Sequence, residues 1–393
     1  MILSPSDVPT SITDAINARI LAVSEDKIQG FLPDPLAEIA RLAGVDTAAV
    51  AGRIAAMLRA GVIRRVRQTL MSINLAHGAL VAWKVPADLL NAAFDYMFTQ
   101  DPFSGHIVIR STDRDTPGGG GQFRLWTTLK IPDGYSMTKH CEFLCRKTGA
   151  ERFLLMPAKR VFALGVGHVR RKGMAIGSKS EAVAQDHATT FVQLSALDWQ
   201  VLTALKREFT PEEMEAVAAA GGGQPSARPL FWARRAEEAH VSLDTFLATA
   251  ASLHARGVIG RFSTFLEHVK PDAAGQRVTQ YNALFHWAVP AGRELEAGYQ
   301  VGRFHIMTHA YWREGGPVFN HVNVMGVAHG TEKETVLAHK AAIDEHLLAS
   351  GIPIAYTNVF WGGRSEIKPS EISPVAYEQW CVSNGIDPAA MRG

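Results

Sequence analysis

The chain contains an internal duplication, which constrains its fold more than any other feature of the sequence. Three segments recur in the same order: 57–66 (MLRAGVIRRV) as 253–262 (LHARGVIGRF), 81–86 (VAWKVP) as 285–290 (FHWAVP), and 105–110 (GHIVIR) as 308–313 (THAYWR). The offsets between the copies are 196, 204 and 203 residues, and an eight-residue insertion in the second copy explains the first change. We therefore infer two diverged copies of one unit.

Each copy begins with a segment of helical periodicity. Residues 35–63 hold two apolar runs with i, i+3, i+4 and i+7 spacing, broken at Gly44-Val45-Asp46, and Asp46 or Thr47 is a suitable N-cap for the second run. Two short helices joined by a tight glycine turn predict a helix-turn-helix. The second copy repeats this pattern between LDWQVLTALKREF at 197–209 and SLDTFLATAASLHARGVI at 242–259.

The remainder of each copy predicts a β-α-β-β-α-β order, which is ferredoxin-like. In the first copy the expected strands are ALVAWKVP (79–86), HIVIRS (106–111), FRLWTTLKI (123–131) and RVFALGV (160–166), with helices at 87–98 and 137–147. The predicted fold class is α+β, a pseudo-dimeric tandem repeat of a winged helix-turn-helix and a ferredoxin-like domain. The expected parts are helix-turn-helix domains at 1–70 and 193–266, ferredoxin-like domains at 71–167 and 267–393, the second with a C-terminal tail, and a polar linker at 168–192.

Composition excludes several classes of protein. Charged residues make up 20% of the chain and the net charge is +2, so bulk charge indicates neither a nucleic-acid nor a membrane partner. The N-terminus has neither a basic nor an apolar leader, no apolar run approaches the length of a membrane span, and we expect a cytoplasmic protein. Three cysteines form no disulfide framework, and Cys141 and Cys145 are interpreted as ordinary thiols.

A His-x-x-x-Arg pair recurs in both copies, as His106/Arg110 and His309/Arg313. Residues i and i+4 of a strand lie on one face, so both side chains of a pair can point into one pocket. Arginine grips a carboxylate with two parallel hydrogen bonds. Histidine donates or accepts protons near neutral pH and can also bind iron.

The predicted recognition helices offer little to DNA. A DNA-reading helix needs basic and polar side chains for phosphates and base edges. The first offers Arg53 and Arg59 among alanines, and the second offers Arg256 near its end. We do not expect a nucleic-acid partner, although two such helices in one chain leave a two-half-site DNA-binding protein as an alternative.

The combination of these segments resembles the Lrp/AsnC family, and within it the siroheme decarboxylases, in which two related subunits or fused halves remove carboxyl groups from siroheme. The resemblance rests on Gly-Val-Ile-x-Arg at 61–65 and 257–261, Trp-x-Val-Pro at 83–86 and 287–290, and the His-x-x-x-Arg segments, above all 308–313. It covers both halves. It implies a carboxy-lyase that acts in haem or modified-haem biosynthesis, with an iron tetrapyrrole as substrate or ligand and no added cofactor.

The resemblance also assigns roles to residues. His309 and His106 are the expected catalytic residues, as proton donors, carboxylate anchors or axial iron ligands, and no metal site is otherwise assigned. The expected substrate-binding residues are Arg313, Arg110, Arg65, Arg261, Arg64, Arg67, Lys84, Arg124 and Tyr311. Additional candidates of lower rank are His305, His321 and His329.

Two other functions compete with this interpretation. One is a non-catalytic haem or tetrapyrrole-binding protein on the same scaffold, and the other is an Lrp/AsnC-like transcription regulator. In every case no membrane partner is expected, and the chain is expected to form a pseudo-dimer that could also pair as a homodimer.

Overall fold

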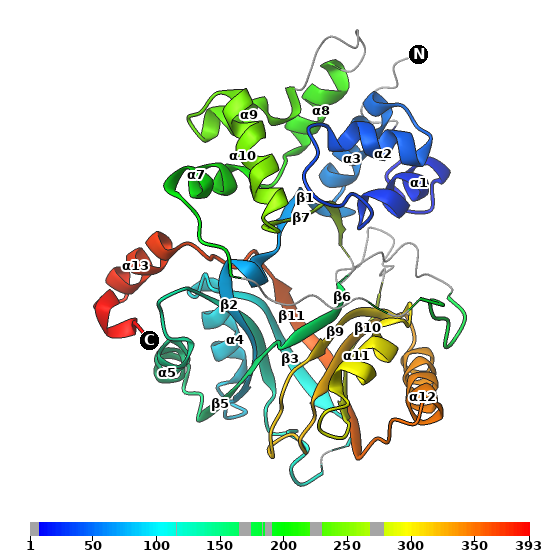
Figure 1. The fold of residues 1–393 in the computed structure, drawn as a ribbon, viewed down its shortest axis with the longest axis vertical. Helices are drawn as coiled ribbons and strands as arrows, with labels where there is room; N and C mark the ends of the chain where they lie inside the picture. The colour runs from blue at the N-terminus through cyan, green and yellow to red at the C-terminus, as the bar shows by residue number, and fades with distance from the viewer. Residues whose placement is uncertain are drawn as a thin grey trace. The chain divides into compact units, whose positions relative to one another are not determined.

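The computed structural model describes residues 8–114, 116–164, 174–182, 184, 191–220, 230–267 and 279–393. These fall into two compact units, each described by itself (Figure 1). The helical unit is assembled from 1–71, 166–172 and 192–278, and the sheet unit from 72–165, 173–191 and 279–393. Each unit therefore combines segments from both copies of the repeat.

The first half of the helical unit is a series of helices followed by a strand. Its elements are α1 (Ala15–Ser24), α2 (Pro35–Ala43), α3 (Thr47–Arg59) and β1 (Ile63–Leu70). Gly44 ends α2 with a φ of 62°, a left-handed conformation that glycine adopts without steric cost. Asp46 caps α3, because its Oδ1 accepts a hydrogen bond of 2.8 Å from the Ala49 N–H. The prediction of Asp46 as N-cap is confirmed.

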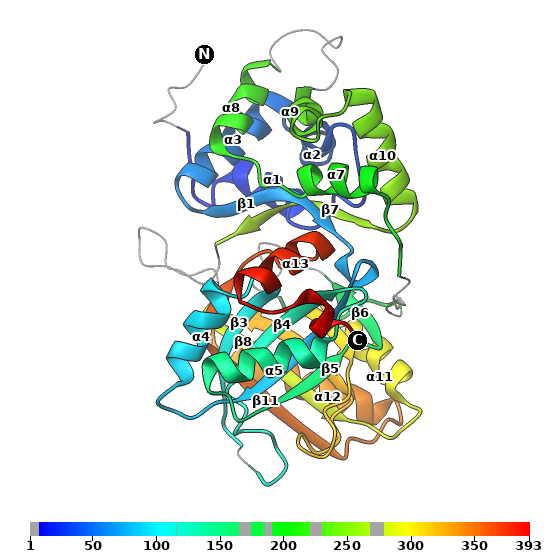
Figure 2. The same cartoon turned by 90° about the vertical axis from the view of Figure 1, so that its left-hand side faces the viewer.

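The second half of the helical unit contains one more helix than the first. Its elements are α7 (Ala196–Leu205), α8 (Pro211–Ala220), α9 (Leu230–Glu238), α10 (Leu243–Ala255) and β7 (Ile259–Leu266). The bounds of α10 lie 196 positions after those of α3, as the repeat predicts. Strands β1 and β7 pair antiparallel as a two-stranded ribbon, and the additional helix α8 packs against α3 (Figure 2).

The sheet unit is built on one nine-stranded sheet. The first copy supplies β2 (Ala76–Lys84), α4 (Leu90–Thr99), β3 (Ser104–Thr112), β4 (Leu125–Pro132), α5 (Met137–Thr148), β5 (Arg152–Pro157) and β6 (Arg160–Leu164). The second supplies β8 (Tyr281–Ala288), α11 (Glu294–Gly302), β9 (Met307–Trp312), β10 (Val324–Gly330), α12 (Lys333–Ala349) and β11 (Tyr356–Ile367). The strand order is β5-β2-β4-β3-β11-β8-β10-β9-β6, so the fourth, first, third and second strands of each copy lie side by side in that order.

Strand β6 corrects one expectation. The segment RVFALGV was predicted as the fourth strand of the first copy, but β5 occupies that place by pairing with β2. Strand β6 instead pairs with β9 of the second copy, and β11 likewise pairs with both β8 and β3. The error arose because only Ala158 and Lys159 separate β5 from β6, so one extended segment pairs first with β2 and then with β9. Strands β5 and β6 are also the two edges of the sheet, so the two-residue connection brings the end of one edge strand close to the start of the other.

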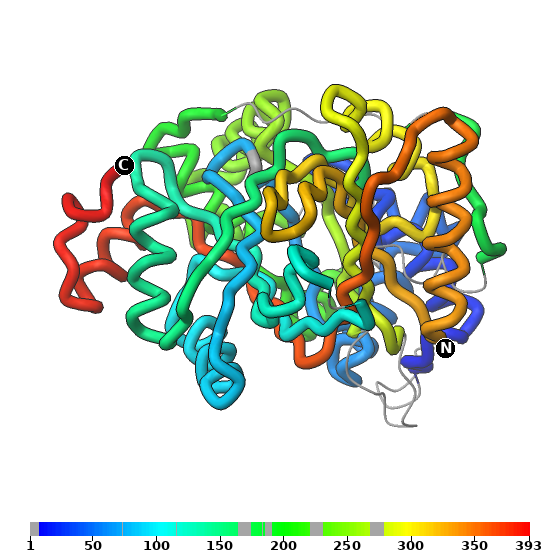
Figure 3. The backbone as a smooth tube through the Cα atoms, turned by 90° about the horizontal axis from the view of Figure 1, so that it is seen from below, coloured from blue at the N-terminus to red at the C-terminus, as the bar shows by residue number. Residues whose placement is uncertain are grey.

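Alternating side chains of the strands build three cores. On the outer face, one cluster packs under α4, α5 and the C-terminal α13 (Pro374–Ser383), and another packs under α11 and α12. Figure 3 shows the C-terminal segment in red beside α5. The opposite face carries a third cluster that draws on both copies, including Val108, Trp126, Leu284, Met325 and Phe360. We call this the inner face of the sheet.

The predicted linker is described only in part. Residues 168–173, 183 and 185–190 lie outside the described residues, as does the second-copy insertion at 268–278. Residues 174–182 lie against the second copy: Gly177 N–H donates to His339 Nδ1 at 3.2 Å, and Arg303 Nε donates to the Ser180 carbonyl at 2.9 Å. No described helix combines the length and apolar character needed to cross a membrane.

Candidate functional site

Both His–Arg pairs lie on the inner face of the sheet. In β3, Val108 stands opposite Trp126, and both belong to the inner core, so His106 and Arg110 share that face. In β9, His309 stands opposite Val327 and Tyr311 opposite Met325, which are also inner-core residues. The structure therefore places the two predicted pairs, one from each copy, on the same face of the sheet.

The two arginines hold equivalent positions and make equivalent contacts. Arg110 Nη1 donates to the Phe360 carbonyl at 3.2 Å, and Arg313 Nη1 donates to the Met156 carbonyl. Phe360 and Met156 are themselves 204 positions apart, matching the offset of the repeat. Each guanidinium therefore reaches the fourth strand of the other copy, β11 from Arg110 and β5 from Arg313.

No carboxylate among the described residues pairs with Arg110 or Arg313, although their exposed fractions are only 4% and 9%. Burial lowers the pKa of Arg110 to about 9 and also lowers the pKa of Arg313. Both stay cationic at neutral pH. A buried cation without an anion is costly, so these positions favour an anionic ligand.

Tyr311 and His309 form a row with Arg313 along β9. The Arg313 guanidinium lies 4.4 Å from the centroid of the Tyr311 ring. The His309 ring stacks with the same Tyr311 ring, with 6.0 Å between the two centroids and an interplanar angle of 15°. Burial raises the pKa of Tyr311, so its phenol stays protonated at neutral pH. The first copy has Val108 at the equivalent position and lacks this row.

A chain of hydrogen bonds joins Arg110 to His309. Arg110 Nη2 donates to Asn282 Oδ1 at 3.1 Å, and Asn282 Nδ2 lies 3.1 Å from His329 Nε2. His329 Nδ1 lies 3.4 Å from Thr308 Oγ1, which lies 3.2 Å from His309 Nδ1. The arginine of the first pair is thereby connected to the histidine of the second.

His106 has a different environment. Its Nε2 lies 2.9 Å from the Ser365 hydroxyl of β11, and its backbone N–H donates to Thr128 Oγ1 at 2.9 Å. The two histidines thus occupy equivalent positions with different hydrogen-bond partners.

Lys84 and Arg124 lie closer to the surface of the sheet unit. Lys84 Nζ forms an ion pair of 2.8 Å with Glu151, and the Arg124 side chain is exposed. Arg124 meets Arg110 through the backbone, where its carbonyl accepts the Arg110 N–H at 2.7 Å. His305 and His321 are exposed. Of the candidates of lower rank, His329 alone enters the chain described above.

Four further arginines predicted to bind substrate lie together on the β1–β7 ribbon of the helical unit. They are Arg64, Arg65, Arg67 and Arg261. Burial lowers the pKa of Arg67 to about 10, and repulsion from the other three arginines adds to this effect against the attraction of Glu208. Arg65 Nε pairs with Glu208 at 2.9 Å, and Arg261 Nε donates to the Glu25 carbonyl at 3.3 Å. Their role in substrate binding stays a prediction.

The basic residues of the predicted recognition helices are engaged within the helical unit. Arg53 Nη1 pairs with Asp14 at 3.0 Å, Arg59 pairs with Glu215 at 2.8 Å and with Glu212 at 2.9 Å, and Arg256 pairs with Asp198 at 2.6 Å. Glu212 and Glu215 belong to α8.

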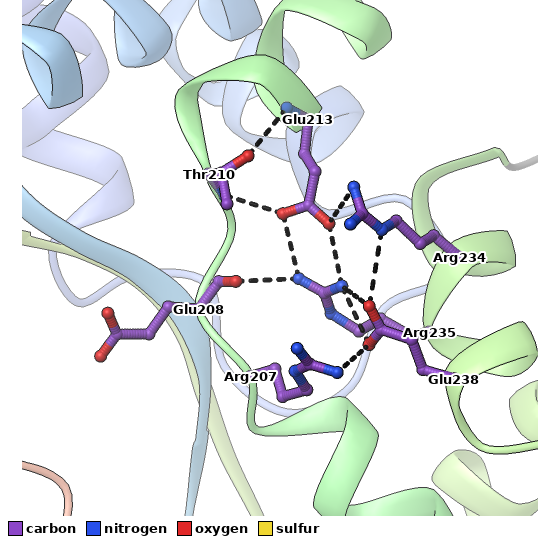
Figure 4. Close-up of polar contacts among 7 residues, drawn as sticks. All are labelled: Arg207, Glu208, Thr210, Glu213, Arg234, Arg235 and Glu238. Atoms are coloured by element: carbon purple, nitrogen blue, oxygen red, sulfur yellow. Dashed lines mark hydrogen bonds and ion pairs between the residues drawn. The ribbon is translucent and has the colours of Figure 1, made fainter.

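Helix α8 is fixed to α9 by a buried arginine. Figure 4 shows Arg235, which is 2% exposed, donating to Glu213 at 2.9 Å, to Glu238 at 3.0 Å and to the Glu208 carbonyl at 2.9 Å. Since Glu213 lies in the first turn of α8, this network places the acidic side chains of α8 beside α3.

Sequence reasoning missed Asn282 and Thr308. A signal was present, because the first copy has Gly78 and Gly105 at the equivalent positions, so the second copy gained two hydrogen-bonding side chains next to a repeated motif. Among the described residues, no group of three or more His, Cys, Asp or Glu could hold a metal ion.

Comparison with protein-family models and with curated protein sequences finds no match. Solved structures do match. The crystal structure of the siroheme decarboxylase NirDL superposes with a TM-score of 0.62 at 17% identity, covering 95% of this chain and 100% of that one. The chain shares its fold with siroheme decarboxylase NirDL. The same enzyme in complex with an iron-uroporphyrin III analogue gives a TM-score of 0.61 at 16% identity and covers 94% and 99% of the two chains. The mixed α+β class and the resemblance are confirmed at the level of the fold.

Proposed function

We propose that this protein is a tetrapyrrole decarboxylase of the siroheme type, a carboxy-lyase that removes acetate carboxyl groups as CO2. The observation that carries the proposal is the pair of buried arginines, Arg110 and Arg313, which face one inner surface without a carboxylate partner among the described residues. A macrocycle ringed by carboxylates would supply the missing anions. The shared fold and the analogue bound by NirDL support the same substrate class.

We further assign the architecture to a tandem of winged helix-turn-helix and ferredoxin-like domains of the Lrp/AsnC type, arranged as a pseudo-dimer. The α2–Gly44–α3 turn, the β1–β7 ribbon and the repeated strand order support this assignment. In this arrangement the two copies play the part of two subunits.

In the proposed reaction, the bond between the acetate methylene carbon and its carboxyl carbon breaks and CO2 leaves. The electron pair stays on the methylene carbon, where the conjugated ring delocalises it, and a proton then converts this group to a methyl. His309 is the proposed proton donor, because it lies on the inner face four residues before Arg313. His106, which lies on the same inner face as Arg110, is proposed to hold another carboxylate.

The test is anaerobic incubation of the purified protein with siroheme, followed by mass spectrometry for loss of CO2 and by absorbance titration for uptake. We expect decarboxylation by the wild type, and H309A should lower its rate by at least about 100-fold while uptake persists. H305A, at an exposed position, is the matched control and should retain full turnover.

Other outcomes would redirect the assignment. Uptake without loss of CO2 would indicate the non-catalytic binder, and no uptake would reject both tetrapyrrole functions. R110M should weaken uptake and change the stability of the unliganded protein little, because the loss of two hydrogen bonds is offset by removal of a buried charge that has no carboxylate partner among the described residues. The transcription-regulator alternative gains no support from Arg53, Arg59 and Arg256, which are all held in ion pairs.

A further inference from the structure

The hydrogen-bond chain beside His309 has a defined direction. Thr308 Oγ1 donates to the Val327 carbonyl at 3.0 Å, and this uses the only proton of that hydroxyl. Toward His309 and His329, Thr308 Oγ1 can therefore act only as an acceptor. Both imidazoles must present an Nδ1–H to it.

The other end of the chain fits this direction. With Nδ1 protonated, neutral His329 has an acceptor at Nε2, which receives the Asn282 Nδ2–H at 3.1 Å. The amide is oriented in turn by Arg110, whose Nη2 donates to Asn282 Oδ1. Every link from Arg110 to Thr308 therefore pairs a donor with an acceptor. The guanidinium of Arg110 can only donate hydrogen bonds, so it sets the direction of the whole chain.

The consequence for His309 is a fixed tautomer. Its Nδ1–H is committed to Thr308, so Nε2 is the nitrogen that gains and loses a proton. The same Nδ1–H···O contact stabilises the imidazolium form, which a proton donor must reach in each cycle.

At the positions of Asn282 and Thr308 the first copy has glycines, so it lacks the two side chains that link this chain. The register places Gly78 opposite Lys130 where the second copy pairs Asn282 with His329, and Gly105 stands at the position of Thr308. His106 contacts the Ser365 hydroxyl through Nε2 instead. The two half-sites are equivalent in backbone and unequal in chemistry.

We propose that only the His309 half-site transfers protons and that His329, acting through Thr308, is its positioning residue. This inference rests on the proposed decarboxylase function. His309 takes up a proton at Nε2, delivers it to the methylene carbon left by CO2, and returns to the neutral Nδ1–H form. The His106 half-site binds carboxylates and delivers no proton.

The test compares variants by the pH dependence of single-turnover decarboxylation of siroheme. T308V removes the acceptor at almost constant shape and should lower the maximal rate about 10-fold to 100-fold and shift the pH profile, while the apparent affinity changes little. T308S keeps the hydroxyl and should restore most of the rate.

Variants of His329 and Ser365 complete the comparison. The maximal rate of H329N, whose amide can still donate to Thr308, should exceed that of H329A. S365A, the matched change beside His106, should leave the pH profile unmoved.

Nitrogen-15 NMR of the histidine rings in the unliganded protein gives a readout that does not depend on activity. We expect His309 to be protonated at Nδ1 in the wild type and to lose this preference in T308V. A wild-type His309 protonated at Nε2 overturns the positioning inference whatever the activity. Equal loss of rate in T308V and S365A overturns the asymmetry, and absence of decarboxylation in the wild type overturns the proposed function itself.

Discussion

The inner face of the sheet carries polar residues at positions where an ordinary core would be apolar. Besides Arg110 and Arg313 it holds His286, which is fully buried between the rings of Trp126 and Phe360. Neither ring nitrogen of His286 has a partner among the described residues. Burial, followed by repulsion from Arg110 and Lys340, lowers its pKa to about 3. His286 therefore stays neutral in the folded protein throughout the physiological range.

This residue should make the protein sensitive to acid. Below the ordinary histidine pKa of 6.5, His286 binds a proton in the unfolded chain, whereas in the folded chain it does so only near pH 3. The free energy of unfolding therefore falls as the pH drops between these two values. The slope for one such group is about 1.4 kcal/mol per pH unit. H286L should remove this contribution and, because two unsatisfied nitrogens disappear, raise the free energy of unfolding at pH 7 by about 1–2 kcal/mol.

Urea unfolding of the two proteins between pH 4 and pH 7 checks this expectation. M325L, at the residue opposite His286 in the strand register, is the control and should keep the wild-type pH slope. If H286L and the wild type lose stability in parallel as the pH falls, His286 is not the group responsible.

At the scale of elements, the strands that cross between the copies hold the sheet unit together. Strand β6 pairs with β9, and β11 pairs with both β8 and β3. The crossing of β6 requires a small residue in α11, because a Cβ on Gly298 would lie 2.1 Å from Cε2 of Phe162 in β6. A glycine in a helix lowers helix stability, and here the close approach of the Phe162 ring explains its presence.

Gly298→Ala should therefore destabilise the sheet unit by about 1–3 kcal/mol, since steric overlap with Phe162 outweighs the gain in helix propensity. The matched control is Gly52→Ala in α3, where a Cβ would meet nothing within 4 Å, and this change should be neutral or stabilising. Thermal unfolding measured by circular dichroism compares the two. A stabilised G298A protein would contradict the packing of β6 on α11.

At the scale of the whole molecule, the two halves of the chain do not form two independent domains. The helical unit and the sheet unit each take segments from both copies, and the inner core of the sheet unit contains residues from both. Each copy alone would expose an inner face and an unpaired strand edge. In the proposed pseudo-dimer, the fusion of the copies would supply within one chain what a dimer supplies with two.

Chains that end at residue 184 or begin at residue 185 should consequently not behave as stable monomers. We expect each to aggregate or self-associate when produced alone, and the two to form a soluble one-to-one complex when produced together. Size-exclusion chromatography with light scattering distinguishes these states. A monomeric half that unfolds cooperatively would show that a copy folds without its partner.

The sequence by itself determined the features that depend on neighbouring residues or on the repeat. Helical periodicity and a capping residue predicted α3 from Asp46 onward, and the two-residue period of a strand placed His106 with Arg110 and His309 with Arg313 on common faces. Self-comparison also found the family resemblance to be strongest at 308–313, although it did not identify Asn282 or Thr308.

The tertiary structure alone decided which segments meet. Arg110 reaches the carbonyl of Phe360 across 250 residues of chain and Asn282 across 172, and β6 leaves its own copy after only two residues. Such contacts are selected by the packing of whole strands and helices, which a local pattern does not encode. Periodicity therefore predicted which side chains share one face of each strand. Packing determined that a hydrogen-bond chain connects Arg110 of one copy to His309 of the other.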